Sequence, residues 1–67
     1  MQVLINGEQQ TIEEGITIQD LVMSLTQLKN RRVVVAQNGV IIPKSQYQAT
    51  IVCVGDSIDV IEAVGGG

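Results

Sequence analysis

The residues with the clearest potential for chemistry are the three glycines that end the sequence, Gly65, Gly66 and Gly67. Glycine lacks a Cβ, so a glycine tail adopts almost any backbone conformation and can thread a narrow slot. No side chain flanks the terminal carboxylate, so a partner enzyme can draw it in and attack it without steric obstruction. The sequence therefore points to a reaction at the carboxylate of Gly67, carried out by another protein.

The remaining residue types exclude most catalysis by the chain itself. Its 67 residues include no histidine and one cysteine, Cys53, so an imidazole base, an intramolecular disulfide and a cysteine-rich metal site are excluded. The net charge is −3 and Tyr47 is the only aromatic residue, which argues against nucleic-acid binding. No apolar run approaches the roughly 18 residues that span a membrane, and no signal peptide is recognisable. We expect a cytoplasmic domain without an active site, a metal or a bound cofactor.

Other polar or reactive side chains have simpler structural interpretations. Cys53 lacks a basic neighbour that would activate its thiol, so a small residue on an extended segment is the favoured reading. Asp56 follows Gly55 and is more typical of a turn than of a ligand. The acidic pair at residues 13–14 fits a solvated loop, and Met23 falls outside the helical stripe described below.

Two β-hairpins are predicted, each closed by an Asn-Gly pair. Such a pair favours a tight type I′ turn, because both central residues of that turn need a positive φ. The first hairpin joins residues 1–5 to a weaker strand at residues 9–13. The second joins residues 33–37 to residues 40–42, and Pro43 ends its second strand.

One amphipathic helix is predicted between the hairpins. Thr17 is its expected N-cap, with Asp20 three residues later as a weak capping-box partner, and Asn30 is its expected C-cap. The apolar residues recur at helical spacing and form a single stripe made of Ile18, Leu21, Val22, Leu25 and Leu28.

The order of elements predicts the fold. A short 3₁₀ segment within residues 44–50, an extended piece at residues 51–54 and a final strand at residues 58–64 follow the second hairpin. One helical stripe must cover one face of one mixed sheet. A hairpin, a crossover helix and a further strand suit a sheet whose first and last strands are neighbours. The predicted class is α+β, a β-grasp (ubiquitin-like) domain at residues 1–64 with four to five strands on one main helix, followed by a flexible tail at residues 65–67.

Over its whole length the chain resembles the ThiS family, the bacterial sulfur carriers of thiamine biosynthesis. The Asn-Gly to Pro-Lys segment combined with the diglycine end is the more specific part of the resemblance. Val54 departs from the family, which commonly has an acidic residue before Gly-Asp. The matching segments are Met-x-Val-x-Ile-Asn-Gly at the start, Thr17-Ile18-Gln19-Asp20-Leu21, Asn38-Gly39-Val40-Ile41-Ile42-Pro43-Lys44-Ser45-Gln46-Tyr47, Gly55-Asp56-Ser57-Ile58 and Val64-Gly65-Gly66-Gly67.

The resemblance implies a role for the glycine tail. A ThiF-like adenylyltransferase would use ATP to adenylate the carboxylate of Gly67, which is otherwise a poor electrophile. Sulfur from a cysteine desulfurase persulfide would displace AMP and leave a thiocarboxylate, and a ThiG-like thiazole synthase would receive that sulfur. The chain would then be a carrier and co-substrate, not an enzyme, with Gly65, Gly66 and Gly67 entering the partner's active site.

Three alternatives remain open at the level of sequence. The molybdopterin-synthesis sulfur carriers also end in Gly-Gly, although they tend to be longer and richer in aromatic residues. A ubiquitin-like tag would be joined through Gly67 to lysines of other proteins. A plain β-grasp binding module would carry an idle, frayed tail.

Strand alternation also predicts a partner-binding face. Val33 and Val35 in the strand at residues 33–37, and Ile58 and Val60 in the final strand, would face the helix. The opposite face has no second helix to cover it, and an exposed apolar patch of this kind marks an interaction surface. We expect it to dock on the activating enzyme and on the thiazole synthase. Its members would be Leu4, Val34, Ala36, Ile61 and Ala63.

Overall fold

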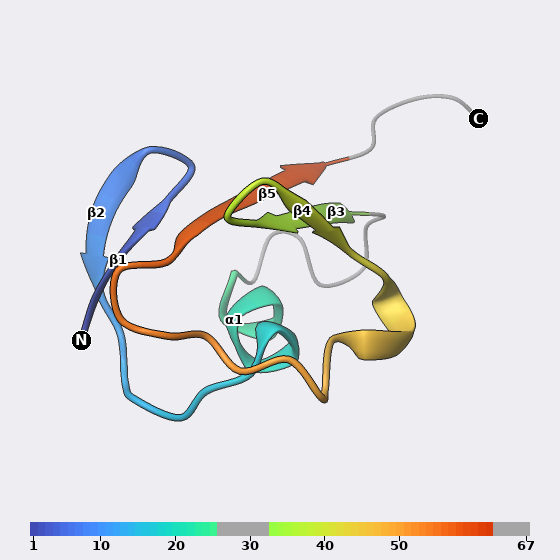
Figure 1. The fold of residues 1–67 in the computed structure, drawn as a ribbon, viewed down its shortest axis with the longest axis horizontal. Helices are drawn as coiled ribbons and strands as arrows, with labels where there is room; N and C mark the ends of the chain where they lie inside the picture. Colours follow the sequence, from blue (N-terminus) through green and yellow to red (C-terminus); the bar gives the residue numbers. More distant parts are fainter. Residues whose placement is uncertain (26–32, 63–67) are drawn as a thin grey trace.

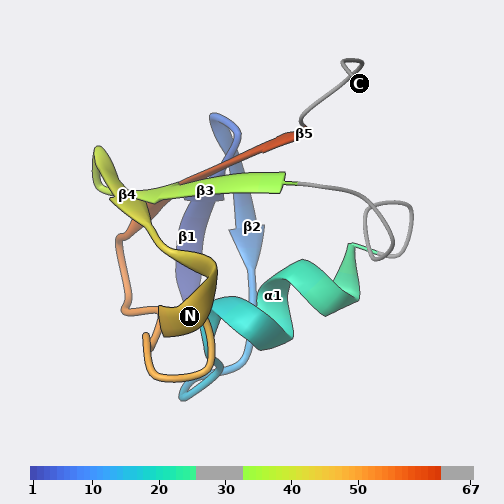
Figure 2. The same cartoon turned by 90° about the vertical axis from the view of Figure 1, so that its right-hand side faces the viewer.

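The structure, a computed structural model, describes residues 1–25 and 33–62, and these form one mixed sheet with one helix packed beneath it (Figures 1 and 2). The strand order is β2-β1-β5-β3-β4, in which β5 runs parallel to β1 and antiparallel to β3. The predicted β-grasp fold, with neighbouring first and last strands, is confirmed. The elements are β1 (Gln2–Ile5), β2 (Glu8–Thr11), α1 (Ile18–Ser24), β3 (Val33–Gln37), β4 (Val40–Ile42), the 3₁₀ helix η2 (Lys44–Gln46) and β5 (Ser57–Glu62).

Both Asn-Gly pairs form the predicted tight turns. The φ angles are 53° at Asn6 and 82° at Gly7, and 52° at Asn38 and 83° at Gly39. A Cβ at either glycine would meet nothing within 4 Å, so the backbone angle and not lack of space is what favours glycine there. The turns join β1 to β2 and β3 to β4.

The predicted start of the helix is confirmed. The hydroxyl oxygen of Thr17 accepts a hydrogen bond from the backbone N–H of Asp20 at 3.1 Å, and the Asp20 carboxylate accepts one from the N–H of Thr17 at 3.1 Å. This reciprocal pair satisfies two backbone donors that have no partner within the helix.

The predicted end of the helix is wrong, because α1 stops at Ser24 and its C-cap is Leu25, not Asn30. The Ser24 hydroxyl donates to the carbonyl of Leu21 at 2.7 Å, and the Leu25 N–H donates to the carbonyl of Val22 at 3.1 Å. These short-range bonds satisfy carbonyls that would otherwise accept from the next helical turn. Residues 26–32, which include Leu28 and Asn30, lie outside the described residues.

Two extended segments are shorter than predicted. The return strand expected at residues 9–13 spans Glu8–Thr11, and all four of its residues are exposed. The extended piece expected at residues 51–54 is reduced to a single bridge between Ile51 and Thr17. The return strand is polar, so it has little apolar surface to bury. The second segment is followed closely by a turn, which leaves little length for a strand.

The core lies between α1 and one face of the sheet, as Figure 2 shows. It is aliphatic apart from Tyr47, which is 4% exposed and follows η2. Burial raises the pKa of the Tyr47 hydroxyl, because the charged form loses its solvation. The buried members are Val3, Ile5, Ile18, Leu21, Val22, Val35, Tyr47, Val52, Ile58 and Val60.

Replacing Thr17 with alanine should lower the free energy of unfolding by about 1 kcal/mol, because the N–H of Asp20 loses its acceptor. In a domain of this size that corresponds to roughly 4–8 °C in melting temperature, measured by circular dichroism. Met23→Ala is the control, since Met23 is 52% exposed on the same helix. Equal melting temperatures for the two variants would contradict a stabilising role for the cap.

Candidate functional site

The site is organised by β5, the central strand that leads toward the glycine tail. Ile58 and Val60 are 0% and 6% exposed, whereas Asp59 and Ile61 face solvent. The predicted alternation of this strand is confirmed. Residues 63–67 lie outside the described residues, so the roles of Ala63, Gly65, Gly66 and Gly67, and the division of the chain into a domain and a tail, stay predictions.

The asparagine of each hairpin turn holds β5 in place. Asn6 accepts a hydrogen bond through its side-chain oxygen from the N–H of Val60 at 2.8 Å, and its own N–H donates to the carbonyl of Ile58 at 2.9 Å. On the other side of β5, the side-chain oxygen of Asn38 accepts from the N–H of Ser57 at 2.9 Å, and its N–H donates to the Ser57 carbonyl at 2.8 Å. The sequence predicts both turns, but it does not predict that their asparagine side chains also bond to β5.

A buried carboxylate secures the loop that enters β5. Asp56 is 9% exposed, and one of its oxygens accepts from the side-chain amide of Gln37 at 2.8 Å and from the N–H of Cys53 at 2.8 Å. Its other oxygen accepts from the side-chain amide of Asn38 at 2.9 Å. Burial on its own raises the pKa of Asp56, but the three hydrogen bonds to the ionised form outweigh it and hold that pKa below its usual value. The predicted turn is confirmed by the Asp56 N–H bonding to the Cys53 carbonyl at 3.0 Å.

The described part of the predicted partner-binding face lies on one side of the sheet, opposite α1. Leu4, Val34 and Ile61 are 41%, 39% and 57% exposed, and Ala36 is half-buried. Val34 lies directly opposite Ile61, whereas Leu4 lies beside Ser57, four residues along β5 from Ile61.

Ile41 belongs to the same face and was not foreseen. It lies opposite Ala36 in the β3–β4 ladder and is 60% exposed. Residues that pair directly across two strands share a face, so this pairing assigns Ile41 there. The two-residue turn at Asn38-Gly39 fixes that register and is the sequence signal that could have found Ile41. The apolar cluster is therefore centred on Val34, Ala36, Ile41 and Ile61, and Leu4 lies toward its other end.

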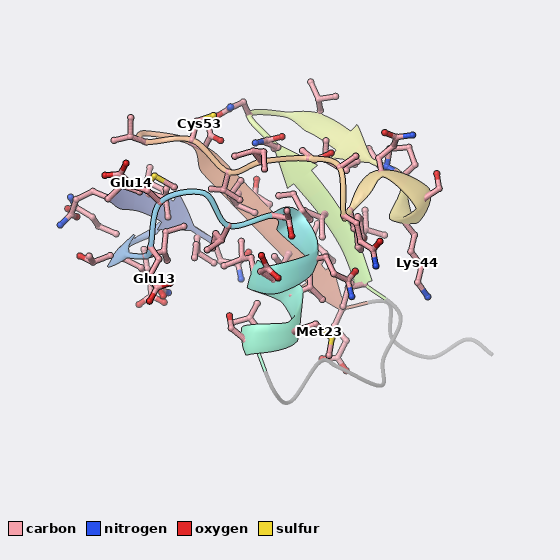
Figure 3. All side chains as sticks on the ribbon, turned by 90° about the horizontal axis from the view of Figure 1, so that it is seen from below. Glu13, Glu14, Met23, Lys44 and Cys53 are labelled. Carbon is pink, nitrogen blue, oxygen red and sulfur yellow. The ribbon has the colours of Figure 1, made fainter. Side chains whose placement is uncertain are left out.

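The other candidate residues have the positions expected of structural or solvated groups. Figure 3 shows Cys53 and Glu14 on neighbouring loops, where they line a shallow, mainly apolar hollow, while Met23 and Lys44 project from other parts of the molecule. The thiol of Cys53 is exposed, and Glu13 and Glu14 are both exposed as predicted. Within residues 1–25 and 33–62, no cluster of three acidic, cysteine or histidine side chains suits a metal ion. In the same part of the chain, no helix has the length and apolarity to cross a bilayer.

A five-stranded sheet on one helix, with a central strand that leads to a glycine-rich end, defines a ubiquitin-like protein of the β-grasp class. Residues 3–67 match the family model described as the ThiS family. The chain belongs to the ThiS family.

Several known proteins are similar to it. The sulfur carrier protein ThiS of Bacillus subtilis strain 168 is 45% identical over 51 residues, which are 76% of each chain. Thiazole synthases of Paramagnetospirillum magneticum and Magnetococcus marinus are 34% and 31% identical over all 67 residues, and the chain spans 20% of the length of each. The crystal structure of a thiamine biosynthesis protein (ThiS) from Geobacter metallireducens superposes with a TM-score of 0.86 at 28% identity and covers 100% of both chains.

Replacing Asp56 with alanine should destabilise the fold by about 1–3 kcal/mol, because its three donors lose a buried acceptor. The pKa of Asp56 is lowered by folding, so its contribution is present above its usual value of 3.8 and is lost as the pH falls through the lower folded value. Thermal unfolding should therefore show a gap between wild type and Asp56→Ala that closes in strong acid. Asp59→Ala, at an exposed position on β5 three residues further along, should show neither effect. A gap that stays constant down to strong acid would contradict this assignment.

Proposed function

We propose that the chain is a sulfur carrier for thiazole formation in thiamine biosynthesis, loaded as a thiocarboxylate on Gly67. The observation that carries the proposal is membership of the ThiS family over residues 3–67, which includes the glycine end. The 45% identity to the sulfur carrier protein ThiS of Bacillus subtilis supports it. The described residues offer a rigid support for such a tail, because β5 is bonded to a strand on each side.

The proposed chemistry needs little from the carrier itself. A ThiF-like adenylyltransferase attaches AMP from ATP to the carboxylate of Gly67 and releases pyrophosphate, which turns a poor electrophile into a mixed anhydride. Persulfide sulfur supplied by a cysteine desulfurase attacks that carbonyl and AMP leaves. Reductive cleavage of the remaining S–S bond by a thiol yields the thiocarboxylate. The carrier binds no cofactor in this scheme and acts as a co-substrate, not an enzyme.

A thiazole synthase of the ThiG type is the proposed acceptor. Two thiazole synthases contain a segment similar to this entire chain. The presence of a carrier-like segment and a thiazole synthase in one polypeptide supports the proposal that the two act together. The exposed thiol of Cys53 is compatible with a reducing cytoplasm, where we place these steps.

The open sheet face is the proposed docking surface for both enzymes. Its apolar cluster includes Val34 and Ile61, at the end of β5 from which the chain continues toward Gly67. Docking there would bring the partner's active site within reach of Gly67, which is five residues after Glu62 in the sequence. Burying one aliphatic side chain is worth about 1.5–3 kcal/mol, so a few such contacts suffice for a transient complex.

Deleting Gly67, or replacing it with alanine, should abolish sulfur loading while changing stability by less than about 0.5 kcal/mol, because a terminal glycine has no side chain to pack. Loading is measured by intact mass after incubation with the adenylyltransferase, ATP and a sulfur source. Exchange of one oxygen for sulfur in the wild type, and none in the variants, is the expected result. Loading of the deletion variant, or attachment of the wild type to protein lysines, would contradict the proposal.

Replacing Ile61 with aspartate should weaken binding to the adenylyltransferase and the thiazole synthase at least tenfold, which corresponds to about 1.4 kcal/mol. A charge at this position must be desolvated in the complex, whereas it stays in water in the free chain. Met23→Glu is the matched control, because it adds the same charge at a similarly exposed apolar residue on the helix side. Calorimetry that gave equal affinities for both variants would exclude this docking face.

A further inference from the structure

The two Asn-Gly turns have nearly identical backbones but different surroundings. Asn6 accepts a hydrogen bond from the N–H of Val60 through its side-chain oxygen. The side-chain nitrogen of Asn6 takes no part in that contact. Asn38 uses both ends of its amide, since the oxygen accepts from Ser57 and the nitrogen donates to Asp56 at 2.9 Å. The same chemical change at the two asparagines therefore has different consequences.

Asn-Gly is a sequence prone to spontaneous deamidation, because glycine has no Cβ to hinder attack by its own backbone nitrogen. At the second turn, the nitrogen of Gly39 bonds to the side-chain carbonyl carbon of Asn38, and the bond from that carbon to the amide nitrogen breaks. Ammonia leaves with the proton from the Gly39 nitrogen. Water then opens the cyclic imide to aspartate or isoaspartate, and no oxidant or reductant is required.

We propose that Asn38 is a deamidation site whose product breaks the clasp, meaning the side-chain hydrogen bonds of Asn38 with Ser57 and Asp56, while conversion of Asn6 to aspartate leaves β5 held. The aspartate formed at position 38 places an oxygen where the amide nitrogen lay, 2.9 Å from an oxygen of Asp56. Two carboxylates at that distance cannot both stay ionised without a large cost. Aspartate at position 6 retains the oxygen that accepts from Val60.

Within residues 1–25 and 33–62, the groups hydrogen-bonded to the Asp56 oxygens carry no charge that would relieve this repulsion. They are the amide of Gln37 from β3, the amide of Asn38 from the turn and the N–H of Cys53 from its own loop. The Cys53 thiol lies instead 4.0 Å from the carbonyl oxygen of Ile51. A carboxylate at position 38 would therefore lie against one oxygen of Asp56, while the donors from Gln37 and Cys53 bond to the other oxygen.

The same hydrogen bonds keep the turn closed before the reaction, and their loss keeps it open afterwards. While Asn38 is bonded at both ends, its amide cannot turn toward the nitrogen of Gly39, so reaction proceeds from a locally opened turn. Once the product has formed, closing the turn brings two carboxylates together. A transient opening thus becomes a lasting one, and the strand that leads to the glycine tail loses one of its two side-chain supports.

The first test compares Asn38→Asp with Asn6→Asp by thermal unfolding at neutral pH. Asn38→Asp should melt lower by roughly 5 °C or more, and Asn6→Asp should stay within about 2 °C of wild type. One of the paired carboxyls in Asn38→Asp is forced to a raised pKa, so its penalty is present at neutral pH and shrinks as the pH falls and a proton is taken up. Equal melting temperatures for the two variants would overturn the proposal.

The second test exchanges the two groups. In the double variant Asn38→Asp with Asp56→Asn, the new amide nitrogen at position 56 donates to the new carboxylate at position 38. The new amide oxygen accepts from Gln37 and Cys53 as the carboxylate did, so every bond is kept and only the bond between positions 38 and 56 has its direction reversed. The double variant should recover at least half of the melting temperature lost in Asn38→Asp. A double variant as unstable as the sum of the two single variants would overturn the proposal.

The third test uses the wild-type chain aged at mildly alkaline pH. Peptide mapping should find a gain of one mass unit at position 38, and native-state hydrogen exchange of the modified fraction should show faster exchange at the N–H of Ser57. Exchange at Val60 should be much less affected when position 6 alone is converted to aspartate. An absence of modification at position 38, or unchanged exchange at Ser57 in the modified fraction, would overturn the proposal.

Discussion

The position of β5 between β1 and β3 is the constraint on which the rest of this small protein depends. The strand pairs in parallel with β1 and antiparallel with β3, so it joins two hairpins that are far apart in the sequence. Its inward residues, Ile58 and Val60, meet the helix, and its outward residues help form the open face. A chain of 67 residues without Phe or Trp has little core to spare, so one misplaced central strand would cost it most of its buried apolar surface.

Hydrogen bonds from polar side chains fix the position of β5 more specifically than aliphatic packing does. Asn6 and Asn38 each use a turn conformation to place an amide against β5, one from each side. Asp56 is buried, and neutral donors from β3, the turn and its own loop favour its ionised form. A buried charge of this kind is tolerated because its hydrogen bonds are all made, and each donor depends on the others being in place. The register of β5 is therefore set by specific bonds as well as by apolar packing.

This arrangement separates support from chemistry. The described residues form a rigid platform with one apolar face open to a partner, and the proposed reaction lies five residues beyond Glu62. In the proposed scheme the carrier needs no acid, base or metal of its own, because the partner enzymes would supply activation and sulfur. Recognition would then depend on the exposed surface and on the reach of the C-terminal residues, and a chain without histidine could take part in group transfer.

The amino-acid sequence by itself determined the parts of this protein that rest on local interactions. The two Asn-Gly turns, the Thr17 cap and the alternation of β5 follow from backbone angles, short-range hydrogen bonds and strand periodicity, and the glycine end with its family resemblance pointed to the proposed chemistry. Only the tertiary structure decided which groups from distant segments meet. The hydrogen bond between Asn38 and Asp56 depends on β5 lying beside β3. It joins residues that are 18 positions apart in the chain, and no local periodicity encodes it.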